Sequence, residues 1–142
     1  MSPMQMGRME VAIRLVLSCT ERYNRHDSGS ILDLLSDDCV FESAEPAPSG
    51  TVHAGKESIS VYLEGCFSGP SQPSIEVEEI FGMGYRCILR YRRNWIDPAG
   101  MSRSVRGIDL FTVRNQKICE WLSYAKASQD GAGTRPAKTE DA

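Results

Sequence analysis

Apolar residues follow a helical period in the first half of the chain. Between Met9 and Arg25 they recur three and four residues apart, which predicts a helix with one buried stripe. The stretch 31–36 follows Ser30, a candidate N-cap, and predicts a second, short helix. Residues 56–67 repeat the helical spacing and predict a third helix. The first stripe contains Ala12, Leu15, Val16, Cys19 and Tyr23, and the third helix groups Ile59, Tyr62, Leu63 and Cys66.

The second half of the chain has the composition of strands. A short strand at 39–43 and a Pro- and Gly-rich loop at 44–55 come before the third helix. After it, apolar-rich segments joined by short turns predict four strands in an antiparallel, curved sheet. These strands are 74–81, 85–96, 104–113 and 117–125. The predicted fold class is therefore α+β.

The length of 142 residues is that of one domain with a core of its own. Residues 1–8 lack a clear pattern and are predicted to be a flexible N-terminus. The segment 128–142 is polar and aperiodic, so we predict a disordered tail. The folded domain is expected to span 9–127.

The hairpin around Pro98 decides which side chains share a face with Asp109, a carboxylate in the middle of an apolar strand. Pro98 and Gly100 suit a three-residue turn, which pairs Asp109 with Leu89. A two-residue turn would instead pair Asp109 with Ile88. With the three-residue turn, the face of Asp109 includes Leu89, Tyr91, Arg93, Trp95, Val105, Gly107 and Phe111.

The next hairpin leaves two alternatives. A three-residue loop pairs Asp109 with Trp121, whereas a two-residue turn at 115–116 pairs it with Leu122. We prefer the first, because it groups Trp121 with the other aromatic residues of that face.

Composition argues against several kinds of partner. The net charge is −3, and the arginines of 90–106 are interpreted as a solvated face, so no nucleic acid is expected. The apolar run 11–19 is interrupted by Arg14 and is too short to cross a membrane. Five scattered cysteines without a C-x-x-C pair predict reduced thiols in a cytoplasmic protein and no metal site. A near-match to a phosphate-binding loop ends in Glu57 instead of Ser or Thr, and we expect no cofactor.

Three segments carry a resemblance to a known superfamily: "YNRHDSGSILDLLSDDCVFE" (23–42), "HAGKESISVYL" (53–63) and "RGIDLFTVRNQKICEWLSYAK" (106–126). With the predicted element order, they resemble the nuclear transport factor 2-like superfamily, and within it the SnoaL-like proteins. The resemblance implies a cone, in which a curved, mostly antiparallel sheet is wrapped by three N-terminal helices around an apolar pocket. It also implies a homodimer, and the stripe Ile108, Leu110, Leu122 and Tyr124 would form its interface.

The superfamily's catalytic residues match this sequence only in part. Asp109 matches the acid that ketosteroid isomerases use as an oxyanion donor. Their proton-shuttling aspartate falls on Ser43 and their tyrosine donor on Cys19. The final-strand aspartate of limonene-epoxide hydrolases and SnoaL-type cyclases falls on Ser123. Classical steroid isomerisation is therefore not expected.

The candidate catalytic residues are Asp109, His53 and Arg93. Burial would raise the pKa of Asp109 toward the range of acid–base work, unless Arg93 forms a structural ion pair with it. The expected function is an isomerase, cyclase or hydrolase acting on an apolar, ring-containing small molecule. The alternatives are a ligand-binding module without turnover and a dimeric scaffold. The candidate binding residues are Cys19, Tyr23, Phe41, Ser43, Tyr62, Tyr91, Trp95, Phe111, Trp121 and Ser123.

Overall fold

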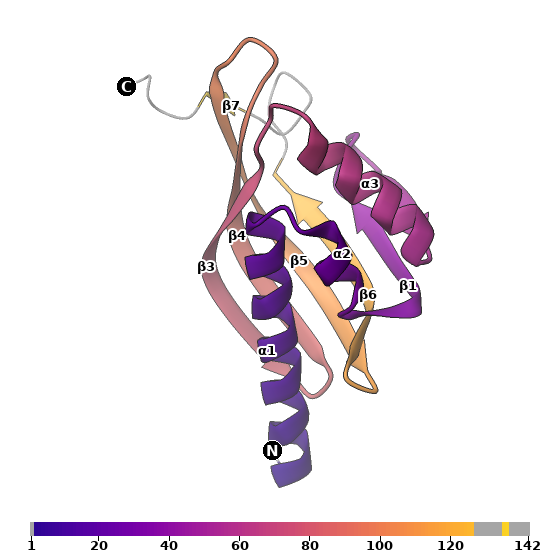
Figure 1. Cartoon of the computed structure of the whole chain (residues 1–142). Helices are drawn as coiled ribbons and strands as arrows, with labels where there is room; N and C mark the ends of the chain where they lie inside the picture. The colour runs from indigo at the N-terminus through magenta and orange to yellow at the C-terminus, as the bar shows by residue number, and fades with distance from the viewer. Residues whose placement is uncertain (1, 127–134, 137–142) are drawn as a thin grey trace.

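Three helices cover one face of a curved sheet (Figure 1). The computed structural model describes residues 2–126 and 135–136. The strand order is β2-β1-β6-β5-β4-β3, and all neighbours are antiparallel except the parallel pair β1 and β6. The predicted α+β fold is therefore confirmed. The strands are β1 (Leu35–Ser43), β2 (Thr51–Ala54), β3 (Ser74–Met83), β4 (Arg86–Ile96), β5 (Ser102–Arg114) and β6 (Lys117–Ala125).

Helix α1 (Pro3–Asn24) begins earlier than the sequence pattern predicted. The Ser2 hydroxyl accepts a hydrogen bond from the Gln5 backbone N–H, and the Gln5 side chain accepts one from the Ser2 N–H. This capping box, with Pro3 in the first turn, satisfies donors that would otherwise have no partner. The prediction of a flexible segment at 1–8 is therefore wrong from Ser2 onward.

The short elements that follow α1 also differ from the prediction. Helix α2 (Ser28–Leu32) is capped by Asp27, whose side chain accepts from the Ser30 N–H, so Ser30 is not the N-cap. The predicted loop at 44–55 contains β2, which pairs with β1. Helix α3 (Lys56–Ser68) lies where the apolar spacing placed it.

The β4–β5 hairpin has the predicted register. Gly100 adopts a positive φ of 84°, and the Asp97 N–H donates to the Met101 carbonyl at 2.9 Å. Asp109 lies opposite Leu89. The face that contains Asp109, Tyr91 and Arg93 is therefore correctly predicted.

The β5–β6 hairpin corrects the preferred pairing. Its turn is the two-residue Asn115–Gln116, in which both residues have positive φ, as a type I′ turn requires. A bulge between Thr112 and Val113 then shifts the register by one residue, so that Asp109 lies opposite Ser123 and not Trp121. Trp121 still shares the face of Asp109, because side chains two residues apart point the same way.

The core fills the space between the helices and the concave face of the sheet. Gly107 has a direct role there, because a Cβ at this position would lie 2.8 Å from the Tyr91 hydroxyl. Because Gly107 has no Cβ, the Tyr91 ring can lie across β5. The largest fully buried side chains include Phe111, Ile31, Leu35, Ile59, Leu63 and Ile118.

A last short strand joins the sheet near the C-terminal end of the chain. β7 (Arg135–Pro136) pairs with β5 at Arg103 and Ser104, and the rest of the predicted tail lies outside the described residues.

All five cysteines are free, and Cys19, Cys39 and Cys87 are buried. None of the helices in the described part of the chain has the length and apolar character that crossing a bilayer requires.

Candidate functional site

The Asp109 carboxyl group lies in the middle of β5 on the concave face and is 5% exposed. The Trp121 indole Nε1 donates to its Oδ2 at 2.8 Å, and the Ser123 hydroxyl donates to its Oδ1 at 2.5 Å. The Tyr91 hydroxyl is a third hydrogen-bond partner. These donors come from β4 and β6, so neighbouring strands on both sides fix the position of the carboxyl group.

The pKa of Asp109 is raised above its ordinary value because burial disfavours the charged carboxylate. Hydrogen bonds from Ser123, Trp121 and Tyr91 oppose this shift, as does the positive charge of Arg93. Burial prevails, so the proton is held more tightly in the folded chain than in the unfolded chain.

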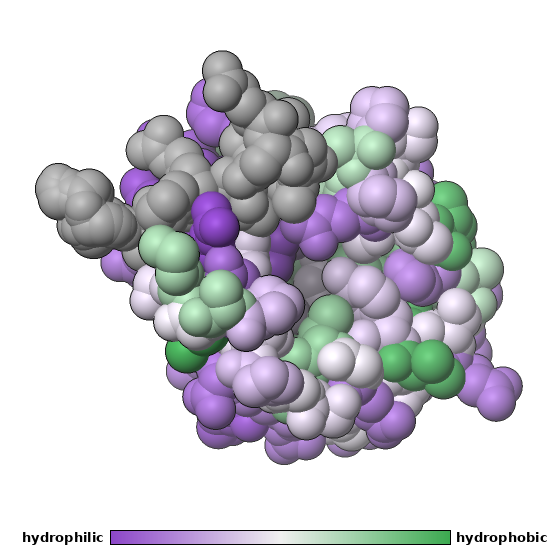
Figure 2. All heavy atoms as spheres, turned by 90° about the horizontal axis from the view of Figure 1, so that it is seen from above, coloured by the Kyte–Doolittle hydropathy of each residue, from purple (hydrophilic) through white to green (hydrophobic). Residues whose placement is uncertain are grey.

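Asp109 faces a small cavity with about 50 Å³ of free space. That is room for a few water molecules and lies far below the roughly 300–1,000 Å³ of ordinary ligand sites. The cavity lies toward the end of the sheet where β1 and β6 finish, and the molecule is hollowed when seen from that end (Figure 2). The lining residues are Tyr23, Phe41, Ser43, Ala44, Glu45, Tyr62, Leu63, Ile75, Tyr91, Arg93, Asp109, Trp121, Ser123 and Ala125.

Arg93 does not form the ion pair with Asp109 that the sequence left open. Its Nη2 lies 3.2 Å from Glu45 Oε2, and its guanidinium group lies 4.6 Å from the centre of the Trp95 ring. Trp95 therefore supports Arg93 and is not part of the cavity wall. Glu45 was missed, because it belongs to the loop between β1 and β2, where no periodic pattern predicts which way a side chain points.

His53 lies behind the cavity wall, on β2. Its ring stacks on Phe41, with ring centres 5.6 Å apart, and contacts Tyr62 at 4.5 Å. Burial lowers the pKa of His53, which favours the neutral imidazole. Its Nε2 is buried and has no hydrogen-bond partner among the described residues.

Cys19 and Phe111 belong to the core and do not line the cavity. Burial raises the pKa of the Cys19 thiol to about 12, and the nearby Asp109 carboxylate adds to the shift. Cys19 is therefore a protonated thiol at neutral pH. Ser43 lines the cavity, but its hydroxyl donates to the Glu45 carbonyl at 2.8 Å. No group of three or more His, Cys, Asp or Glu suited to a metal ion occurs within residues 2–126 and 135–136.

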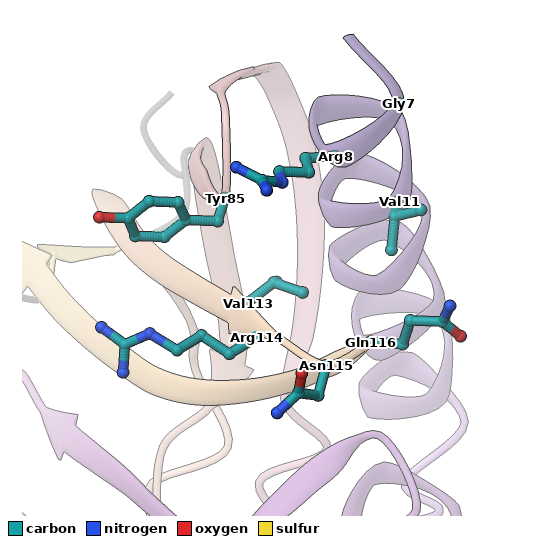
Figure 3. Close-up of a pocket in the computed structure, with 8 residues that line it drawn as sticks. All are labelled: Gly7, Arg8, Val11, Tyr85, Val113, Arg114, Asn115 and Gln116. Carbon is teal, nitrogen blue, oxygen red and sulfur yellow. The ribbon is translucent and has the colours of Figure 1, made fainter. Parts of the chain in front are cut away.

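A second, larger groove of about 510 Å³ lies at the opposite end of the sheet. It runs between α1 and the turns that end the β3–β4 and β5–β6 hairpins (Figure 3). Its floor includes Val113, and Arg8 extends from α1 toward Tyr85. None of the residues that line it also lines the cavity of Asp109.

The raised pKa of Asp109 predicts a pH dependence of stability. The proton on Asp109 stabilises the fold fully below the unfolded pKa of about 3.9, and each tenfold gain in proton affinity on folding contributes about 1.4 kcal/mol. This contribution is lost as the pH rises through the folded pKa. The unfolding free energy of the native chain, minus that of Asp109→Asn, should therefore fall above about pH 4 and then level off. Urea unfolding of both proteins from pH 3 to pH 9 measures this difference.

Taking the difference in unfolding free energy between the native chain and Asp109→Asn removes the contributions of other acids, whose stabilisation changes with pH in the opposite direction. The pKa of Asp97 is lowered, chiefly by its hydrogen bond with Arg103, but Asp97 is present in both proteins. A difference that is flat or that grows with pH would contradict the raised pKa of Asp109.

The model of the SnoaL-like domain family matches residues 16–121. The chain belongs to this family. Solved structures agree with the assignment. An NTF2-like protein of unknown function from Mesorhizobium loti is 28% identical to the SnoaL-like chain, with a TM-score of 0.71 over 84% of this chain and 94% of that one.

Two Mycobacterium tuberculosis proteins share the fold at lower identity. One, described as an LEH-like epoxide hydrolase, is 17% identical, with a TM-score of 0.72 over 87% of each chain. The other, solved in complex with estradiol-17β-hemisuccinate, is 20% identical, with a TM-score of 0.70 over 85% of this chain and 96% of that one. Among proteins of curated function, none matches the SnoaL-like chain by sequence.

Proposed function

We propose that this SnoaL-like protein is a cofactor-free acid–base enzyme of the isomerase, cyclase or hydrolase type, acting on an apolar, ring-containing small molecule. The observation that carries the proposal is the Asp109 carboxyl group, which is buried, held by partners on β4 and β6, and exposed to a cavity. A carboxyl group whose pKa is raised by burial is suited to give or take a proton near neutral pH.

In the proposed mechanism, protonated Asp109 donates a hydrogen bond or its proton to a carbonyl or epoxide oxygen of the substrate. Trp121 Nε1–H keeps Oδ2 in place, while the Ser123 hydroxyl can donate to the carboxylate or accept from the acid. Arg93, on the same cavity, polarises a substrate oxygen. His53 is the candidate base for a substrate that reaches past Phe41 and Tyr62.

The aromatic lining supports an apolar ring compound as the ligand. Tyr23, Tyr62 and Tyr91 line the cavity, together with Phe41 and Trp121. The relative that binds estradiol-17β-hemisuccinate accommodates such a ring system in the same fold. Ligand sites usually measure about 300–1,000 Å³, so side chains of the cavity wall must move when a ligand enters.

A ligand-binding module without turnover is the alternative. It is favoured by the absence of two partners that ketosteroid isomerases use, because Ser43 is bound to a backbone carbonyl and Cys19 is buried in the core. A scaffold role has no such support, because it does not explain why the Asp109 carboxyl group is buried beside a cavity.

A panel of ring compounds tests the proposal. It should contain a cyclic epoxide, a β,γ-unsaturated cyclic ketone and estradiol-17β-hemisuccinate, each incubated without metal or nucleotide and followed by mass spectrometry. We expect conversion of the epoxide or the ketone, and binding of the steroid. Binding without conversion of any compound would favour the alternative.

We also propose that the protein forms a homodimer through the convex face of its sheet. Ile108 and Tyr124 are 41% and 56% exposed on this face, beside Leu110 and Leu122. A monomer would leave this apolar stripe in water. Light scattering at micromolar concentration should give twice the chain mass of 15.8 kDa, and Ile108→Glu should give the monomer mass. A native chain that is monomeric would contradict the proposal.

The location that we propose is the cytoplasm. All five thiols are free, and such thiols persist in a reducing compartment.

A further inference from the structure

One ion pair crosses the cavity of Asp109. It joins Arg93, near the end of β4, to Glu45, in the loop between β1 and β2, with 3.2 Å between Nη2 and Oε2. Both residues line the cavity. The backbone of Glu45 is held in place, because its carbonyl accepts hydrogen bonds from the hydroxyls of Ser43 at 2.8 Å and Thr51 at 3.3 Å. The Glu45 side chain can therefore swing away without unfolding the loop.

The two partners are unequally exposed. The Arg93 side chain is 23% exposed and packs on the Trp95 ring, and it lines the cavity together with Tyr23, Tyr62 and Tyr91. The Glu45 side chain is 45% exposed. The arginine is therefore a fixed part of the cavity, whereas water can hydrate the released carboxylate of Glu45. An exposed partner of this kind contributes little to an ion pair.

We infer that Arg93 is the binding site for an anionic group of the ligand, which takes the place of the Glu45 carboxylate. The ligand class is then an apolar ring compound that carries a carboxylate or a similar anion. This inference rests on the proposed function for the location of the ligand. It follows from the fixed guanidinium group, because an anion in a partly dehydrated site gains a stronger charge-assisted hydrogen bond than it would in water.

The same exchange opens the cavity. In the paired state the free space is about 50 Å³, too little for a ring compound. Release of Glu45 removes the contact between the β1–β2 loop and β4 that the ion pair provides. An anionic ligand thus supplies a replacement for the ion pair that it breaks, and a neutral ligand does not.

Two fluorescent probes with the same rings separate charge from shape. These are 8-anilinonaphthalene-1-sulfonate, an anion, and N-phenyl-1-naphthylamine, which is neutral. Each is titrated against the full chain and against Arg93→Gln, Arg93→Lys, Glu45→Gln and the control Arg103→Gln. Arg103 has a nearly equal exposure of 22% and an ion pair with Asp97, but it does not line the cavity.

We expect Arg93→Gln to weaken binding of the anionic probe by about tenfold and that of the neutral probe by less than about twofold, as loss of one charge-assisted bond implies. Arg93→Lys should retain part of the preference. Glu45→Gln should strengthen binding of the anionic probe, because the competing carboxylate is gone. Arg103→Gln should leave both affinities unchanged.

Equal losses for both probes in Arg93→Gln, or weaker binding of the anion to Glu45→Gln, would overturn the inference. So would failure of both probes to bind the native chain. If circular dichroism shows that Arg93→Gln does not fold, the probe affinities of Glu45→Gln and Arg93→Lys test the inference instead. These affinities do not depend on turnover, so a failure of Asp109 as a catalyst would leave the result for Arg93 intact.

Discussion

Replacing Asp109 with asparagine should reduce turnover by about a hundredfold or more, the usual loss when one buried donor to a reacting oxygen is removed. The amide has the shape of the carboxyl group but cannot give up a proton. Its oxygen can still accept from Trp121 Nε1, and its NH₂ can donate to the Ser123 hydroxyl, so the cavity should keep its geometry. The rate should therefore fall while ligand affinity changes little.

The measurement is kcat and the dissociation constant for the converted compound, in the native chain and in Asp109→Asn. Glu42→Gln is the matched control, because Glu42 lies beside Ser43 on β1 but does not line the cavity. It should leave both values unchanged. Full turnover by Asp109→Asn would remove the catalytic role, and loss of affinity alone would indicate a binding role.

Phe111→Ala should lower the unfolding free energy by about 3–5 kcal/mol, the range for truncating a buried aromatic residue. The Phe111 side chain is 1% exposed and stacks on Trp121, with ring centres 5.4 Å apart. It was expected to contact the ligand, but it lies beneath the cavity wall. Urea unfolding measures the loss.

Two variants of the same strand are controls for that effect. Phe111→Leu keeps most of the volume and should lose far less stability. Arg114→Ala truncates an exposed side chain at the end of β5, outside the apolar stripe proposed for the dimer, and it should also be tolerated. A small effect of Phe111→Ala would mean that the ring is not part of the core.

The fold was largely predictable because the chain's long elements have clear periods. The face shared by Asp109, Tyr91 and Arg93 followed from Pro98 and Gly100, which suit one turn type. The β5–β6 pairing did not follow, because the bulge near Cys119 has no local sequence mark. The two-residue turn and the bulge each shift the partner of Asp109 by one residue, from Trp121 to Ser123. Residues two apart on a strand point to the same face, so the predicted face was correct although the predicted partner was wrong.

The candidate site was predictable where strand alternation decides direction, as for Asp109, Trp121 and Ser123. It was not predictable at Glu45, which reaches Arg93 from a loop. Nor could periodicity show the depth of a side chain, so Cys19 and Phe111 were assigned to the cavity although they are packed in the core. His53 was expected to be catalytic, but its ring lies behind Phe41.

The central claim is that Asp109 acts on a ligand inside the cavity. Its most direct test is a crystal structure of Asp109→Asn with a ring ketone that the native chain converts. We predict the ketone oxygen within about 3 Å of the side-chain amide at position 109, as a hydrogen bond requires. A ketone bound in the groove beside Arg8, or bound in the cavity with its oxygen beyond hydrogen-bond distance, would contradict the account.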